Sequence, residues 1–325
     1  AFGAICGSGP ATAATMASVA LPEMRRYKYS MELAAGAVAS GGSLGMLIPP
    51  SVVFIVYAII TENSIGKLFI AGILPGLLIA ALFCITIYIE CKIRPELGPA
   101  GPRTSWREKF RSLLGVSETL ILFVVVIGGM FGGYFTPTEA ASVGAAGSLV
   151  IALVRRALTW KILVRVLFET LRTSCMVMVI VAGAVIFGRF LAITRIPFEL
   201  AAWLGGLPLP GAVILLFIIL FYLVSGCFVD ALALVLLTVP IFYPVVVNLG
   251  YDPVWFGVII VVVTQMGVIS PPVGVNVYVV AGIARDIPLT TVFRGAMPFL
   301  LALVVAAVVL VFFPQLVLFL PNLVL

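Results

Sequence analysis

Gly45-Met46-Leu47-Ile48-Pro49-Pro50 and Gly267-Val268-Ile269-Ser270-Pro271-Pro272 share one pattern, Gly-x-x-x-Pro-Pro, and each lies inside a long apolar stretch. Two consecutive prolines remove two backbone donors and restrict the residue before them, so one unbroken helix cannot pass through either segment. The sequence therefore predicts two half-helices joined by unwound backbone in each copy. Lipid cannot satisfy open backbone at membrane depth, so a pair of such breaks points to the binding site of a transporter.

The residues around the two Pro-Pro pairs also correspond. Downstream of the first pair, Ile65, Gly72 and Pro75 follow at nearly the spacing at which Ile287, Gly295 and Pro298 follow the second pair. Upstream, the order of Gly7 and Pro22 matches that of Gly226 and Pro240. The alternative is two proline-kinked helices that look alike because membrane helices favour Gly and Pro. We interpret the correspondence as an internal duplication.

The composition places the chain in a membrane. Hydrophobic residues make up 63% of the sequence and charged residues 10%, which excludes an ordinary soluble domain. Apolar runs occur throughout the chain, which excludes a cleaved signal peptide followed by a soluble body. Apolar and polar residues do not alternate with a period of two, so helices are favoured over the strands of an outer-membrane barrel. We expect an all-α polytopic membrane protein. The net charge of +6 then indicates basic cytoplasmic loops rather than a nucleic-acid partner.

The chain contains no histidine, which excludes His-ligated metals, haem with a His ligand, and Ser-His or Cys-His nucleophile pairs. Its five cysteines have no CxxC spacing, and we interpret them as small buried apolar residues. An enzyme is therefore not expected, and no organic cofactor either.

The distribution of basic residues predicts the topology. Lys and Arg cluster at 25–28, 92–111 and 155–172, which the positive-inside rule places in the cytoplasm together with Arg285 and Asp286. The segments 61–64, 134–139 and 248–252 carry no positive charge and are placed outside. The first broken helix then runs outward and the second inward, so the two repeats are inverted. We expect a first repeat at 1–91, a cytoplasmic basic linker at 92–117, and a second repeat at 118–325.

Within the second repeat, the nearly continuous apolar stretch 211–248 is interrupted only around Gly226 and Asp230. We expect a re-entrant helical hairpin at 211–248, with two full spans as the alternative, followed by the broken helix at 254–283. The matching tip in the first repeat is the segment 6–12. Because the chain begins just before that tip, we expect roughly a hundred residues of the first repeat to precede it.

The tips and breaks supply candidate ligands for Na⁺, which prefers the hard oxygens of unwound backbone carbonyls and of Ser, Thr or Asp side chains. Two sets of candidates follow: Gly7, Ser8, Gly42, Ser43 and Gly45 at the first tip, and Gly226, Asp230, Thr264 and Gly267 at the second. For the glycines the alternative is close helix packing. For Asp230, an ionisable residue at membrane depth, the alternative is an ion pair with Arg189.

Half-helix N-termini carry partial positive charge and free N–H groups, so the breaks and tips favour an anionic solute, which we expect to be a carboxylate. The candidate solute-binding residues are Ser8, Gly9, Thr12, Pro49, Pro50, Ser51, Pro271, Pro272 and Asn276.

Several motifs together resemble the large membrane subunit of tripartite ATP-independent periplasmic (TRAP) transporters. They extend over essentially the whole chain: Gly7-Ser8-Gly9 through Ala20-Leu21-Pro22-Glu23-Met24, Gly42-x-x-Gly45-x-x-Ile48-Pro49-Pro50-Ser51, Leu68-Phe69-x-Ala71-Gly72-x-x-Pro75-Gly76, Phe135-Thr136-Pro137-Thr138-Glu139-Ala140-Ala141, and Pro271-Pro272-Val273-Gly274. Ser270 departs from the family, where threonine is more usual.

The resemblance implies Na⁺-driven import of an organic acid, a C4-dicarboxylate or sialic acid, across the cytoplasmic (inner) membrane of a bacterium or archaeon. It also implies a small four-helix membrane subunit, a periplasmic solute-binding protein that delivers the solute, and an elevator movement of the hairpins and broken helices. A stand-alone Na⁺/dicarboxylate symporter is the alternative, and a channel or an intramembrane enzyme is a more distant one.

Overall fold

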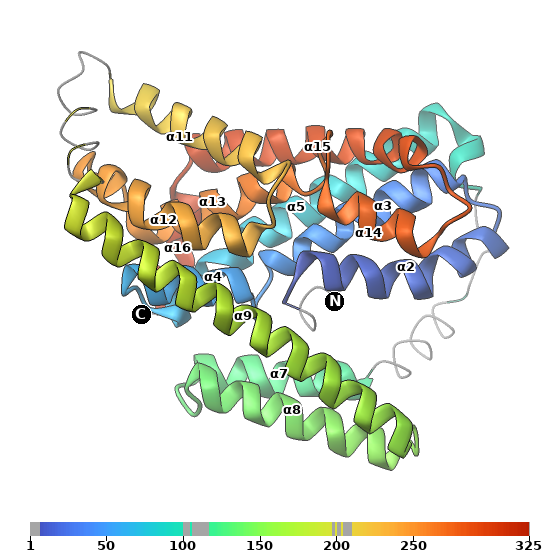
Figure 1. Cartoon of the computed structure of the whole chain (residues 1–325). Helices are drawn as coiled ribbons and strands as arrows, with labels where there is room; N and C mark the ends of the chain where they lie inside the picture. Colours follow the sequence, from blue (N-terminus) through green and yellow to red (C-terminus); the bar gives the residue numbers. More distant parts are fainter. Residues whose placement is uncertain are drawn as a thin grey trace. The chain divides into compact units, whose positions relative to one another are not determined.

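The computed structural model describes residues 7–99, 105, 117–196, 199, 203 and 210–324, and all regular elements within these residues are helical (Figure 1). By length and composition, four helices of this described part suffice to cross a membrane: Ile65–Ile93, Trp160–Leu191, Ala231–Asn248 and Leu289–Phe312. The predicted all-α polytopic membrane fold is confirmed.

The first half of the chain contains the first predicted break. Its helices are α2 (Gly9–Arg26), α3 (Met31–Ser43), the short 3₁₀ turn η1 (Leu44–Met46), α4 (Val52–Thr61), α5 (Ile65–Ile93) and the turn η2 (Pro95–Leu97). Between η1 and α4 the Pro-Pro pair keeps the backbone out of helix. With 13 and 10 residues, α3 and α4 rise about 20 and 15 Å, so neither alone spans a hydrocarbon core of about 30 Å.

The second half contains the predicted hairpin and the second break. The hairpin consists of α11 (Gly211–Gly226) and α12 (Ala231–Asn248), and the broken helix consists of α13 (Pro253–Gly267) and α14 (Val275–Ile283). The chain continues through α15 (Leu289–Phe312) and α16 (Gln315–Val324). The Pro49–Pro50 and Pro271–Pro272 peptide bonds are both cis. The two hairpin helices lie within 211–248, and the two halves of the broken helix lie within 253–283.

Side-chain caps explain why several of these helices begin where they do. Ser51 accepts a hydrogen bond from the Phe54 N–H at 3.3 Å, and Asp252 accepts from the N–H groups of Val254 and Trp255 at 2.8 and 2.9 Å. Such caps satisfy backbone donors that a helix start leaves without partners. The start of α4 is thus set by the serine that directly follows the Pro-Pro pair.

The chain divides into two compact units, Ala1–Ala100 with Phe187–Leu325, and Gly101–Ile186. The smaller unit contains α7 (Ser117–Phe131), α8 (Pro137–Val154) and most of α9 (Trp160–Thr194). Thr136 and Glu139 form a reciprocal capping box at the start of α8.

The basic cluster at 155–172 is not a segment separate from the apolar run that follows it. From Trp160 onward it forms the first part of the 35-residue helix α9, because apolar residues alternate with the basic ones and nothing in the sequence breaks the helix. Most of the predicted basic linker 92–117 lies outside the described residues.

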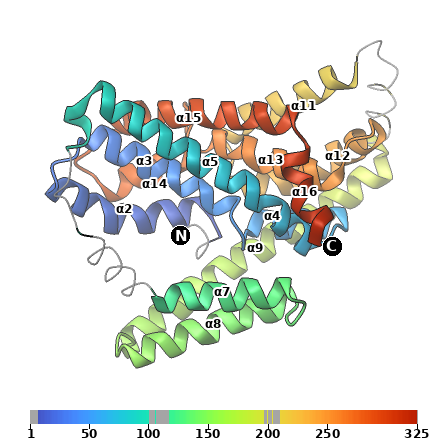
Figure 2. The same cartoon turned by 180° about the vertical axis from the view of Figure 1, so that it is seen from behind.

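The core of the larger unit is built around α3, α5, α13 and α15, and Figures 1 and 2 show α3, α5 and α15 side by side. Every residue of α13 from Val254 to Gly267 is buried. At the crossing of α3 and α15, Gly36 and Gly295 let the two backbones touch, since a Cβ built on Gly36 would lie 2.6 Å from the Gly295 Cα atom. The two halves of the chain therefore share one core.

Candidate functional site

The first hairpin tip lies against the first helix break. The Gly7 carbonyl accepts a hydrogen bond from the N–H of Val52, the first residue of α4, at 3.2 Å. Gly7 has φ +61°, and a Cβ built on it would lie 2.6 Å from the Pro50 carbonyl oxygen. Glycine is required here both by the backbone conformation and by the close approach.

The start of α2 packs on the end of α3 through small residues. A Cβ on Gly9 would lie 3.2 Å from Met46 atoms, and one on Gly45 would meet the Thr12 hydroxyl oxygen and lie 3.1 Å from the Ser8 carbonyl oxygen. Gly42 is in similarly close contact with Ala13. The structure thus brings the predicted residues Gly7, Ser8, Gly9, Thr12, Gly42 and Gly45 together.

Two hydroxyl groups at this junction donate to their own helices. Thr12 Oγ1 donates to the Ser8 carbonyl at 2.7 Å, and Ser43 Oγ donates to the Ser40 carbonyl at 2.7 Å; Thr12 and Ser43 are both buried. A hydroxyl whose proton is used in this way keeps its oxygen lone pairs. Each oxygen can therefore still accept a hydrogen bond or coordinate a cation. Ser51, also buried, donates to the Met46 carbonyl across the break.

The second hairpin tip meets the second break in the same manner. The Cys227 carbonyl accepts a hydrogen bond from the Gly274 N–H at 3.3 Å, which parallels the bond between Gly7 and Val52. Gly226 is in contact with Gly267 and Thr264, and a Cβ on Gly267 would lie 2.6 Å from the Gly226 Cα atom. Three of the four predicted cation ligands of this half therefore lie together.

The buried Thr264 hydroxyl also donates within its own helix, to the Ile260 and Val261 carbonyls at 3.0 and 2.9 Å. Its lone pairs, like those of Thr12 and Ser43, remain free to accept.

Asp230, the fourth predicted ligand, is exposed and caps α12 by accepting a hydrogen bond from the Leu232 N–H at 3.0 Å. Within the described part of the chain it forms no ion pair, and in particular none with Arg189. The alternative of an Asp230–Arg189 pair is therefore not observed. The carboxylate keeps free lone pairs beyond the one that caps the helix.

The two breaks differ in exposure. Pro49 is buried and Pro50 half-buried, whereas Pro271 and Pro272 are exposed. Asn276, in the first turn of the second half-helix, is fully buried and donates through Nδ2 to the Ala39 carbonyl of α3 at 3.1 Å. This hydrogen bond connects the second broken helix to the first.

Four buried polar atoms of the described residues have no partner: Ser40 Oγ, both side-chain atoms of Gln265, and Asn276 Oδ1. Buried polar atoms are nearly always hydrogen-bonded, so these four are exceptions among the described residues. Sequence reasoning included Asn276 but missed Ser40 and Gln265, although a glutamine near the end of the apolar helix α13 was a usable signal. Sequence reasoning also missed Gly274 and Cys227, which join the second tip to the second break through their backbone N–H and carbonyl groups alone.

A sequence profile of the tripartite ATP-independent periplasmic transporter, DctM component, matches residues 1–316. The chain is 40% identical over 322 residues to the C4-dicarboxylate TRAP transporter large permease protein DctM of Pseudomonas aeruginosa, a match that covers 99% of this chain and 75% of that relative. The chain belongs to this family. It is also 37% identical over 323 residues to the sialic acid TRAP transporter large permease protein SiaM of Vibrio cholerae, again with 99% and 75% coverage.

A third relative has the composite name DctMQ. The isethionate TRAP transporter permease protein DctMQ of Oleidesulfovibrio alaskensis is 39% identical over 285 residues, which are 87% of this chain and 45% of that protein. Because the chain belongs to the TRAP large permease family, the paired tips and breaks are parts of a permease and not of an enzyme.

Proposed function

We propose that this chain is the permease subunit of a Na⁺-coupled importer of an organic acid anion, in the cytoplasmic (inner) membrane of a bacterium or archaeon. The observation that carries the proposal is the pair of tip-to-break hydrogen bonds, from the Val52 N–H to the Gly7 carbonyl and from the Gly274 N–H to the Cys227 carbonyl. Each bond holds unwound backbone next to a hydroxyl with free lone pairs, which is the environment that Na⁺ requires.

The proposed ion sites follow the two junctions. The first uses oxygens of Gly7, Ser8, Gly42, Ser43 and Gly45, and the second uses those of Gly226, Asp230, Thr264 and Gly267. Neither needs a histidine, which the chain lacks. Asp230 contributes a negative charge from the exposed tip, so it also draws cations toward the second site.

The proposed solute lies between the junctions, beside the two Pro-Pro segments. The N-termini of α4 and α14 point their partial positive charge there, which favours a carboxylate or another anion, although several of their first N–H groups already donate within the protein. The names of the three relatives mention C4-dicarboxylate, sialic acid and isethionate, which are all anions. The unpaired Asn276 Oδ1 adds an acceptor for a solute hydroxyl or amide N–H.

The proposed movement is an elevator. The hairpin α11–α12, both broken helices, α5 and α15 belong to one compact unit, whereas α7 and α8 belong to the other. In the larger unit, α3 and α15 share one core and contact each other at Gly36 and Gly295, which supports movement of that unit as one body. The proposed partners are a small four-helix membrane subunit and a periplasmic solute-binding protein that delivers the anion.

The test is uptake into proteoliposomes that contain the complete transporter. Radiolabelled succinate and N-acetylneuraminate serve as probes, each with the solute-binding protein of the same transport system. We expect saturable uptake that requires an inward Na⁺ gradient and ceases when choline replaces Na⁺. Uptake without the binding protein would favour a stand-alone symporter, and flux that does not saturate would favour a channel.

A further inference from the structure

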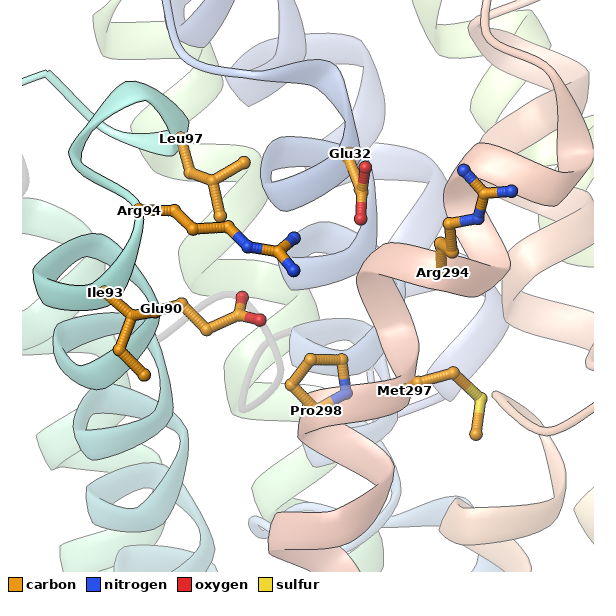
Figure 3. Close-up of a pocket in the computed structure, with 8 residues that line it drawn as sticks. All are labelled: Glu32, Glu90, Ile93, Arg94, Leu97, Arg294, Met297 and Pro298. Carbon is orange, nitrogen blue, oxygen red and sulfur yellow. The ribbon is translucent and has the colours of Figure 1, made fainter.

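A cavity of about 370 Å³ lies in the larger unit, away from the hairpin tips and helix breaks. Residues of α3, α5, η2 and α15 line it: Glu32, Glu90, Ile93, Arg94, Leu97, Arg294, Met297 and Pro298. Figure 3 shows Glu90 and Arg94 extending into it from α5, with Glu32 of α3 and Pro298 of α15 on the opposite side. Its lining therefore combines two carboxylates with the Arg94 guanidinium, whereas the Arg294 guanidinium points away from them.

None of these four charged side chains forms an ion pair within the described part of the chain. The cavity also has an additional backbone acceptor. Pro298 has no N–H, so the Arg294 carbonyl four residues earlier lacks its helical hydrogen bond. One ligand that carries both a cation and an anion would satisfy the carboxylates, the carbonyl and the Arg94 guanidinium together.

The cavity lies at the ends of helices that the charge distribution places in the cytoplasm. Glu32 follows the basic cluster at 25–28, Arg94 ends α5 within the cluster at 92–111, and Arg294 follows Arg285 at the start of α15. These assignments, made independently from three parts of the sequence, meet at one place in the structure. With the topology expected from the charges, that place lies at the depth of lipid headgroups on the cytoplasmic side.

Two apolar stripes lead from the cavity toward the middle of the membrane. On α5 the stripe is Ile93, Ile89 and Ile85, and on α15 it is Met297, Leu301 and Val305; successive members are one helical turn apart, and all are 43–73% exposed. The two helices pack together, with the rings of Phe83 and Phe299 5.2 Å apart. A charged cavity that continues into paired apolar stripes fits an amphipathic ligand.

We propose that this cavity binds the headgroup of phosphatidylethanolamine from the cytoplasmic leaflet, with its acyl chains along the two stripes. The phosphate diester accepts hydrogen bonds from Arg94, whose planar guanidinium suits two phosphate oxygens. The primary ammonium donates to Glu32, Glu90 and the Arg294 carbonyl. A lipid with a glycerol headgroup offers these carboxylates no cation, and a choline headgroup offers them no N–H donor.

The experiment measures which lipids remain bound to the purified complete transporter. The protein is equilibrated with equal amounts of phosphatidylethanolamine, phosphatidylcholine and phosphatidylglycerol, and the retained lipids are counted by native mass spectrometry. We expect phosphatidylethanolamine to be enriched about tenfold over phosphatidylglycerol, and Glu90→Gln to reduce that enrichment about tenfold. Arg94 contacts the phosphate that all three lipids share, so Arg94→Gln should reduce the retention of each of them about tenfold. The matched controls Lys92→Gln and Glu96→Gln change exposed positions outside the cavity. They should leave both the retention and the enrichment of phosphatidylethanolamine unchanged.

Three outcomes would overturn the proposal. Equal or greater retention of phosphatidylglycerol would show that the ammonium is not recognised. Retention that survives both cavity substitutions would place the lipid elsewhere. Displacement by soluble phosphoethanolamine at the same concentration would show that the stripes hold no acyl chains. The comparison of headgroups uses the unmodified protein, so it decides the matter even if a variant fails to fold.

Discussion

Replacing Gly267 with alanine would separate the second hairpin tip from α13. The new Cβ would lie 2.6 Å from the Gly226 Cα atom and 2.7 Å from its carbonyl oxygen. A normal contact needs about 3.5–4.0 Å, so the two backbones must move apart by roughly 1 Å. Neither atom belongs to a side chain that can rotate away. The shift must therefore reach Cys227 and its hydrogen bond with the Gly274 N–H.

The expected cost has two opposing parts. Overpacking of this kind costs about 1–3 kcal/mol, while alanine in place of glycine at the end of a helix returns at most about 1 kcal/mol. The net destabilisation is then about 1–2 kcal/mol. If Na⁺ binds at this junction, a loss of 1.4 kcal/mol in the bound geometry reduces the apparent Na⁺ affinity about tenfold.

The assay is thermal unfolding of the purified protein at increasing NaCl concentrations, with choline chloride holding the ionic strength constant. A ligand that binds only the folded state raises the melting temperature, so the NaCl midpoint reports the affinity. Gly226→Ala is the matched control, since its Cβ would lie 3.4 Å from the Gly267 Cα atom, an ordinary contact. An unchanged NaCl midpoint in Gly267→Ala, or equal shifts in both variants, would refute the reasoning.

Three further substitutions test other parts of the structure. Asp230→Asn keeps the cap of α12, because Asn caps as well as Asp, so we expect nearly unchanged stability but weaker Na⁺ stimulation of uptake; full stimulation at normal expression would remove Asp230 from the ion site. Asn276→Ala leaves the buried Ala39 carbonyl without its donor, and calorimetry should show a loss of about 1–3 kcal/mol, whereas an unaltered transition would mean that water replaces the amide. Thr136→Ala removes the capping box of α8 at a cost of about 1 kcal/mol, seen as faster hydrogen exchange in its first turn, while Glu139→Gln should preserve protection.

The helix breaks could be predicted because their cause is local. A Pro-Pro pair removes backbone donors whatever surrounds it, so both breaks followed from the sequence. The short distance between Gly7 and Val52 was expected only in outline, from the correspondence between the two halves. Which atoms join tip and break depends on how the helices pack, and a pattern of residue types does not contain that information.

Asp230 shows a different limit of sequence reasoning. A carboxylate between two apolar helices serves equally well as a helix cap or as an ion ligand, because both roles need the same oxygen at the same point of the chain. The unpaired atoms of Ser40 and Gln265 mark a third limit. A glutamine in an apolar helix is a local signal that Gln265 is unusual, but whether a buried side chain finds a partner is decided by residues far away in sequence.

The contact between Gly36 and Gly295 constrains how the protein is assembled in the membrane. Glu32 and Gly36 belong to α3, which the ribosome makes early, whereas Gly295 belongs to α15, which follows after most of the chain. Until α15 is inserted, the face of α3 around Gly36 has no helix packed against it, and the first broken helix lacks one of its neighbours. Truncation before α15 should therefore leave a species that is inserted but unfinished, which membrane quality-control proteases can recognise.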